Sequence, residues 1–299
     1  MMLKKTDKVI IQWIIMIALA IVWGSSYILM KRGLEFFPAM QVGALRITIS
    51  FLFLLPFALW RIKRVKKENL KYLVIVGFLG SGIPAFLFAE AQTGLDSQIA
   101  GIINSVAPLF VLIFGTLFFN VRVKWYNVAG VFIGLSGAIG LLSACGNKSF
   151  DSNLGFGIYI IIATMLYSIN INVIKKYLKE TDSLTITAIS FIFIGVPSII
   201  YLMSGTDFIT RLSETPGAMK GMGYLSLLAI LGTALAGILY NYLIKISSVL
   251  FSASVTYIIP IVAIMWGTND GEHFYLGYII WIALIFSGIF LVNKEISET

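Results

Sequence analysis

Ten apolar segments of membrane-spanning length determine what this chain can fold into. Each is close to the roughly 20 residues that an α-helix needs to cross the hydrocarbon core of a bilayer. Long unbroken runs of this kind exclude a membrane β-barrel, which needs short alternating strands. The sequence therefore predicts an all-α membrane protein with spans at 9–30, 36–60, 70–89, 97–119, 124–144, 154–174, 183–203, 221–244, 249–268 and 274–293.

The two halves of the chain are weakly similar to each other. Pro108 aligns with Pro260, and Gly115 aligns with Gly267 at the same offset. Each half carries five predicted spans, and because five is odd, the two copies must enter the bilayer in opposite orientations. In carriers built from such inverted repeats, the substrate site lies at the repeat interface near the bilayer midplane.

We therefore expect two domains, residues 1–150 and 151–299, each a repeat of five transmembrane helices. Composition supports the membrane interpretation, because 59% of the residues are hydrophobic and only 12% are charged. Soluble domains are about half apolar and about a quarter charged.

The net charge of +8 reports on topology rather than on nucleic-acid binding. Sixteen of the 22 Lys and Arg residues fall on one side of the predicted topology and five on the other. By the positive-inside rule, the basic side is cytoplasmic, and it includes both termini and the loop 61–69. We expect a multi-pass protein of the plasma (inner) membrane, with lipids and a small-molecule substrate as partners and no nucleic acid.

Residues suited to catalysis or metal binding are scarce. Cys145 is the only cysteine, so it forms neither an intramolecular disulfide nor a metal cluster. His273 is the only histidine, and with Glu272 it is either a proton-handling pair or two polar residues in a water-facing turn. The chain has no Gly-rich loop ending in Gly-Lys-Ser/Thr, which would indicate an ATP-driven pump. We expect no enzyme, no catalytic residue, no metal and no cofactor.

Arg46 is the clearest charge inside a predicted span. It lies near the centre of 36–60, where a guanidinium costs about 2.5–3.5 kcal/mol even on the lenient insertion scale. Arg46 should therefore face the protein interior and bond a carboxylate or several carbonyl groups. Either it recognises an anion or latches a gate, or it caps the carbonyl groups of a kinked helix. The aligned residue of the second half is Thr187, so this charge is not part of the symmetric scaffold.

Polar and aromatic residues inside the spans predict a cavity of mixed polar and apolar character, the kind that binds small molecules. An asparagine deep in a membrane helix needs a partner, either a neighbouring helix or a ligand. Irregular backbone at matching positions of two repeats also indicates a transporter's site, and the two aligned prolines fit this description. Glu90 either accepts a hydrogen bond from an inward group or marks the membrane interface. The expected cavity residues are Trp23, Ser26, Tyr27, Arg46, Glu90, Asn104, Ser105, Pro108, Tyr167, Asn170, Tyr240, Asn241, Tyr257 and Pro260.

Glycine stripes occur in two of the spans, and proline interrupts others. Small residues let membrane helices approach closely, so we interpret both stripes as packing surfaces. Pro56 and Pro197 are expected to produce packing kinks, because proline removes a backbone donor and clashes with the preceding turn. The stripes consist of Gly77, Gly80 and Gly82 and of Gly130, Gly134 and Gly137.

Several short motifs occur in a characteristic order. They are Val22-Trp23-Gly24 with Lys31, Leu45-Arg46, Ala107-Pro108, Ile259-Pro260, Gly271-Glu272 and Leu284-Ile-Phe-Ser-Gly288. In this order the chain resembles the EamA-type members of the drug/metabolite transporter superfamily over essentially its whole length. The resemblance implies ten helices in two inverted repeats, cytoplasmic termini, and export of amino acids, metabolites or drugs by alternating access.

The chain departs from the pattern of this superfamily at two places. Asn120-Val121 stands near the position of a glutamate expected before the fifth helix. Gly24-Ser25-Ser26 replaces the first-helix carboxylate of the four-helix multidrug relatives, which argues against their proton-for-cation mechanism. We expect a carrier that exports small metabolites such as amino acids or drug-like compounds. The alternative is a membrane receptor or accessory subunit without transport, although a receptor has no need of two opposed copies.

Overall fold

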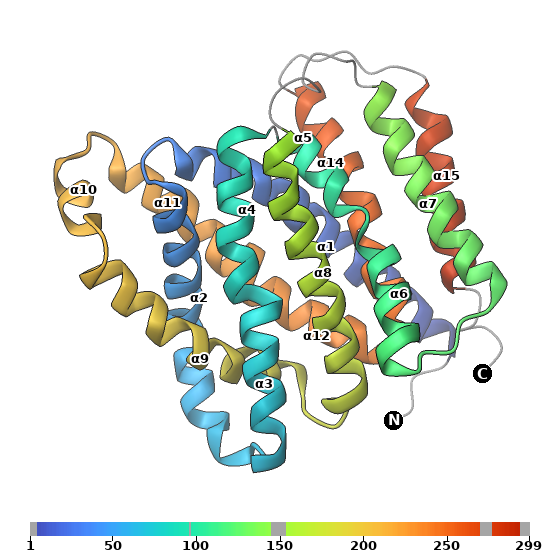
Figure 1. Ribbon diagram of the computed structural model, residues 1–299, viewed down its shortest axis with the longest axis horizontal. Coiled ribbons are helices and arrows are strands. Elements are labelled where there is room, and N and C mark those ends of the chain that lie inside the picture. Colours follow the sequence, from blue (N-terminus) through green and yellow to red (C-terminus); the bar gives the residue numbers. More distant parts are fainter. Residues whose placement is uncertain (1–4, 96, 145–153, 270–276, 294–299) are drawn as a thin grey trace.

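The computed structural model describes residues 5–95, 97–144, 154–269 and 277–293, and within these ranges the chain is helical with no β-strand (Figure 1). The prediction of an all-α fold is confirmed. Cys145, Glu272 and His273 lie outside the described residues. Six helical stretches are long and apolar enough to cross a membrane: Asp7–Leu34, Ala39–Arg64, Lys67–Gly94, Gly155–Tyr177, Ser183–Ser204 and Ala218–Ile246. The shorter apolar helices are Ala107–Phe119, Trp125–Gly140, Val249–Val262 and Tyr278–Asn293.

The helices of the first half follow the predicted spans with short turns between them, except that the span 97–119 is divided into two helices. They are α1 (Lys5–Leu34), α2 (Ala39–Arg61), α3 (Leu70–Gly77), α4 (Ile83–Gly94), α5 (Ser97–Asn104), α6 (Ala107–Phe119) and α7 (Trp125–Ala144). Two 3₁₀ turns, η1 (Ile62–Arg64) and η2 (Lys67–Asn69), connect α2 to α3, and a π-helical segment, η3 (Phe78–Gly82), joins α3 to α4.

The second half also begins with two long helices, which shorter helices follow. They are α8 (Leu154–Tyr177), α9 (Ser183–Ser204), α10 (Phe208–Glu214), α11 (Ala218–Ala229), α12 (Ala236–Ile246), α13 (Val249–Ala253), α14 (Val255–Asn269) and α15 (Tyr278–Asn293). A π-helical segment, η5 (Ile230–Leu235), joins α11 to α12.

Helices far apart in the sequence pack in pairs. Figure 1 shows α7 and α15 side by side, and their contact is close because glycine lines it. A Cβ atom at Gly130 would lie 2.7 Å from the carbonyl oxygen of Gly288, and one at Gly137 would lie 2.9 Å from the amide nitrogen of Ile285. This confirms the packing role that the sequence predicts for the second glycine stripe.

A second pair is formed by α2 and α9, which also pack against each other. Ser198 on α9 donates a hydrogen bond from its hydroxyl to the carbonyl oxygen of Ala44 on α2, at 3.0 Å. Pro56 and Pro197 lie inside these two helices, as the sequence predicts. The contact holds α2, which carries Arg46, against α9.

Two long helical stretches are interrupted by π turns at matching places. The segment η3 separates α3 from α4, and η5 separates α11 from α12. The sequence distance between Phe78 and Ile230, where the two segments begin, equals the distance between Pro108 and Pro260. A π turn changes the backbone hydrogen-bond register locally, and such turns are frequent at functional sites.

Proline has different positions in the two aligned helices. The sequence predicts one helix over 97–119, but the chain turns at Ser105 and Val106, so that prediction is wrong at this point. Pro108 therefore lies in the first turn of α6, where a missing N–H has no helical partner to lose. Pro260 lies inside α14, and the break in its half occurs earlier, at Ser254 between α13 and α14.

Side chains from two other helices cap the carboxyl end of α12. Gln12 of α1 donates from Nε2 to the carbonyl oxygen of Ile246, at 2.5 Å. Lys175 of α8 donates from Nζ to three carbonyl oxygens, those of Ile244 (2.9 Å), Lys245 (3.2 Å) and Ser247 (2.5 Å). The last carbonyl groups of a helix have no partner within the helix, and a cation is favourable there. We call this group of bonds the α12 cap.

Candidate functional site: a polar and aromatic cavity

Helices of both halves surround one cavity with a volume of about 130 Å³. Its wall includes residues of α1, α2, α3, η3, α4, α5, α6, α8, α9, η5, α12 and α14. The structure brings nine of the expected residues together in this wall: Trp23, Ser26, Tyr27, Arg46, Asn104, Tyr167, Asn170, Tyr240 and Asn241.

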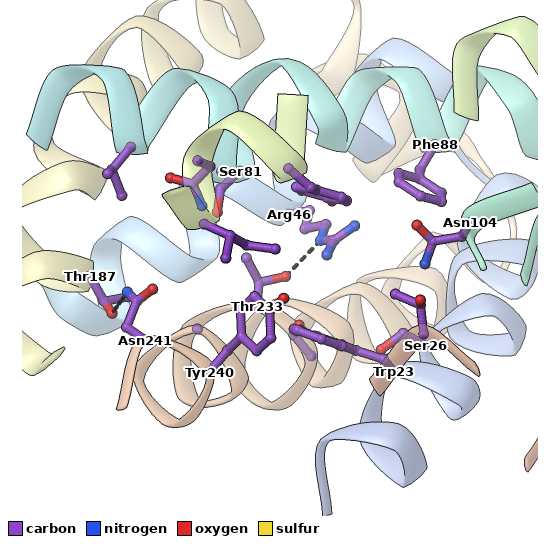
Figure 2. Close-up of a pocket in the computed structure, with 18 of the residues that line it drawn as sticks. Trp23, Ser26, Arg46, Ser81, Phe88, Asn104, Thr187, Thr233, Tyr240 and Asn241 are labelled. Carbon is purple, nitrogen blue, oxygen red and sulfur yellow. Dashed lines mark hydrogen bonds between the residues drawn. The ribbon is translucent and has the colours of Figure 1, made fainter. Parts of the chain in front are cut away.

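Arg46 extends from α2 into the cavity, as Figure 2 shows. Its Nε donates a hydrogen bond to Oγ1 of Thr233 in η5, at 2.6 Å. The expected partner was a carboxylate or a set of carbonyl groups, and that expectation is wrong. Within the described part of the chain, Arg46 forms no ion pair, and its side-chain hydrogen bond goes to this hydroxyl.

Aromatic rings cover two parts of the cavity wall. Trp23 and Tyr240 meet edge to face, with ring centroids 4.9 Å apart and an interplanar angle of 71°. Trp23 also donates from its indole nitrogen to the carbonyl oxygen of Gly232 in η5, at 2.9 Å, and this bond fixes the orientation of the indole. On the other part, Phe88 stacks on Tyr167 with centroids 5.9 Å apart. Such rings provide apolar area in a fixed geometry.

Three asparagine side chains line the cavity, and two of them have unused hydrogen-bonding capacity. Asn241 donates from Nδ2 to the hydroxyl of Thr187, at 2.9 Å. The Oδ1 atoms of Asn104 and Asn170 are buried without a hydrogen-bond partner among the described residues. Because an unsatisfied buried acceptor costs about 1–3 kcal/mol, these two oxygens favour a donor that enters the cavity.

The remaining expected residues do not line the cavity: Glu90, Ser105, Pro108, Tyr257 and Pro260. Tyr257 is fully buried and donates from its hydroxyl to the carbonyl oxygen of Val131, at 2.8 Å, so it joins α14 to α7. Ser105 is fully buried and donates to the carbonyl oxygen of Thr256, at 3.0 Å. Both residues hold helices together beside the cavity. They were misassigned because polarity in a membrane helix does not distinguish a helix contact from a ligand contact.

Several lining residues were not expected from the sequence. Thr233 and Thr187 each bond a polar residue of the wall, and Gly80 allows Asn170 to lie directly against η3. A Cβ atom at Gly80 would lie 2.6 Å from Nδ2 of Asn170, so any larger residue would displace the amide. The available signal is the glycine stripe, whose expected role is mainly packing.

A multi-pass helical membrane protein with a polar and aromatic cavity among its helices has the architecture of a membrane transporter. The chain belongs to the EamA-like transporter family, whose model matches residues 11–143 and again residues 155–294. One match falls in each half of the chain.

Related proteins are also named as transporters. The chain is 30% identical over 272 residues to the inner membrane transporter YedA of Escherichia coli (strain K12), with 89% of this chain and 85% of YedA covered. It is 22% identical over 286 residues to a transporter of Archaeoglobus fulgidus, with 95% of this chain and 99% of that protein covered. A crystal structure with 15% sequence identity has the same fold, with a TM-score of 0.70 over 95% of this chain and 97% of the other.

Proposed function

We propose that this protein is an alternating-access carrier that exports small metabolites, such as amino acids or drug-like compounds, across the plasma membrane. The observation that carries the proposal is the cavity between helices of both halves, which combines aromatic area with a few polar groups. Cavities of this composition are typical binding sites for small molecules. Rocking of one repeat against the other would then expose the cavity to each side of the membrane in turn.

The proposal includes ten spans in two inverted repeats, residues 1–150 and 151–299, with both termini in the cytoplasm. Three observations support it: the two matches of the family model, the corresponding π turns η3 and η5, and the unequal distribution of basic residues. In this topology Cys145 faces the outside.

Labelling of Cys145 tests the orientation. A membrane-impermeant maleimide should react with Cys145 in intact cells, whereas a cysteine introduced as Asn69→Cys in a Cys145→Ala background should be protected. The reverse pattern would overturn the orientation.

Transport is tested by counterflow in proteoliposomes, with a panel of amino acids, organic acids, amines and drug-like compounds as candidate substrates. In a Cys145→Ala background, Asn104→Cys should react with a small water-soluble thiol reagent, and a transported compound should slow that reaction. Ser213→Cys on α10 is the control, because Ser213 is exposed and lies outside the cavity wall. Absence of counterflow for the whole panel, or equal and substrate-insensitive labelling at both positions, would contradict the proposal.

A further inference from the structure

The charge of the cavity wall is unbalanced. Arg46 is the one ionisable acid or base other than tyrosine among the described residues that line the cavity. The acidic residue that the sequence suggested for the cavity, Glu90, lies outside the wall. A buried cation without a nearby carboxylate is unfavourable, so a negative group brought by a ligand would be stabilised there.

The hydrogen bond of Arg46 leaves the two terminal nitrogens of its guanidinium available to a ligand. Its Nε is occupied by Thr233, and no hydrogen bond of either terminal nitrogen, Nη1 or Nη2, to a described residue is found. In Figure 2 the guanidinium lies in the space between Thr233 and Asn104. Two parallel N–H groups at the end of a guanidinium match the two oxygens of a carboxylate. The bond to Thr233 holds the side chain in place from behind.

A second cation in the same protein shows what a purely structural role looks like. Lys175 directs its ammonium at three carbonyl oxygens of the α12 cap, and so its donors are used within the protein. Arg46 does not cap a helix end in this way, since its bond goes to a side-chain hydroxyl. The interpretation of Arg46 as a cap for the carbonyl groups of a kinked helix is therefore wrong.

We propose that the cavity takes small molecules with a carboxylate, which the terminal nitrogens of Arg46 bind, and that it rejects organic cations. The apolar body of the ligand lies against Trp23 and Tyr240, and a donor such as an amine or hydroxyl group satisfies Oδ1 of Asn104 or Asn170. This assignment rests on the proposed function of the cavity as the substrate site.

Matched ligands provide the test. The probes are a carboxylate, its primary amide and the corresponding amine, prepared on propyl, phenylpropyl and indolylpropyl bodies. Binding to the purified full-length protein in detergent is measured from the shift of the thermal unfolding midpoint with ligand concentration. We expect the carboxylate of at least one body to bind roughly 10- to 100-fold more tightly than its amide, with the amine weakest.

Variants link this preference to the guanidinium. Arg46→Gln should remove the preference for carboxylate over amide, and Arg46→Lys should keep part of it, because lysine retains the charge without the planar fork. Thr233→Val should weaken carboxylate binding while the preference remains. Arg211→Gln is the matched control, because Arg211 pairs with Asp207 outside the cavity wall, and it should change nothing. If Arg46→Gln does not fold, Arg46→Lys still decides, because a lysine variant with the full wild-type preference would show that the guanidinium is not needed.

Three results would overturn the assignment. These are binding of an amide or amine as tight as that of its carboxylate, no binding of any carboxylate in the panel, and an Arg46 variant with the wild-type preference. Carboxylate binding without counterflow would refute the transport function and leave the assignment intact. Counterflow of amines without carboxylate preference would refute the assignment and leave transport intact.

Discussion

Lys175 offers a direct measure of what the α12 cap contributes to stability. The substitution Lys175→Met keeps the length of the side chain and removes the ammonium. In the unsubstituted protein, Nζ of Lys175 donates to three carbonyl oxygens at the end of α12, at 2.5–3.2 Å. A hydrogen bond from a charged group contributes about 1.5–3 kcal/mol, and a partly buried cation at a helix carboxyl end contributes up to about 2 kcal/mol.

These contributions do not add, because one ammonium makes all three bonds and loses its own hydration in doing so. We therefore expect Lys175→Met to lower the free energy of unfolding by about 3 kcal/mol, near the upper value for a single charged hydrogen bond. The free energy is measured by titrating the protein in mixed micelles with a denaturing detergent. Lys175→Arg, which keeps a cation at this position, should recover most of the loss.

Lys179→Met is the matched control. Lys179 follows α8 and is exposed, so its replacement should change the free energy of unfolding by less than about 0.5 kcal/mol. If Lys175→Met were no more destabilising than Lys179→Met, the reasoning about the cap would be refuted. In that case, water would solvate the three carbonyl oxygens and the ammonium as well as they solvate each other, and the bonds would contribute nothing to the free energy of unfolding.

Two further predictions concern packing and acid stability. Gly130→Ala should lower the free energy of unfolding by about 1–3 kcal/mol, because the added Cβ would meet backbone atoms of α15. Gly223→Ala should raise the free energy of unfolding by about 0.5–1 kcal/mol, because alanine favours the helix and the added Cβ meets nothing within 4 Å. Titration of both variants with a denaturing detergent checks this. Burial favours the neutral form of Asp182, but hydrogen bonds from Thr185 and the charges of Arg61 and Lys245 outweigh it and lower the pKa of Asp182. The stabilisation is present above the usual carboxyl pKa of about 4 and is lost as the pH falls through the lower pKa of the folded state. The unfolding midpoints of the wild type and Asp182→Asn, measured from pH 7 to pH 3, should therefore converge at low pH; a constant difference would contradict this.

The parts of the fold that follow from local sequence could be predicted. Length and hydropathy are enough to locate apolar helices, and the cost of a buried guanidinium is enough to orient Arg46 toward the interior. The partner of Arg46 could not be predicted, because Thr233 lies 187 residues away and its direction depends on the register of η5.

In the candidate site too, the type of residue could be predicted from the sequence, but its partners could not. Trp23, Tyr167 and Asn170 combine aromatic and polar character inside a span, and the structure has all three in the cavity wall. Tyr257 has the same character, yet it faces α7, because the break at Ser254 sets the direction of α14. No single-sequence signal marks that break, and so the chemistry of a residue was easier to predict than the direction in which it points.

The π turn η5 affects the direction in which the side chains of α12 point. Each residue of an α-helix turns the chain by about 100°, so one residue more or fewer in the middle rotates every later side chain by that amount. Tyr240 and Asn241 lie after η5, and both face the cavity that Thr233 lines from within η5. A regular α-helix over the same stretch would direct them to a neighbouring helix or to lipid. The π turn thus acts as a one-residue insertion, and its gain or loss would rotate α12 so that different side chains of the same segment face the cavity.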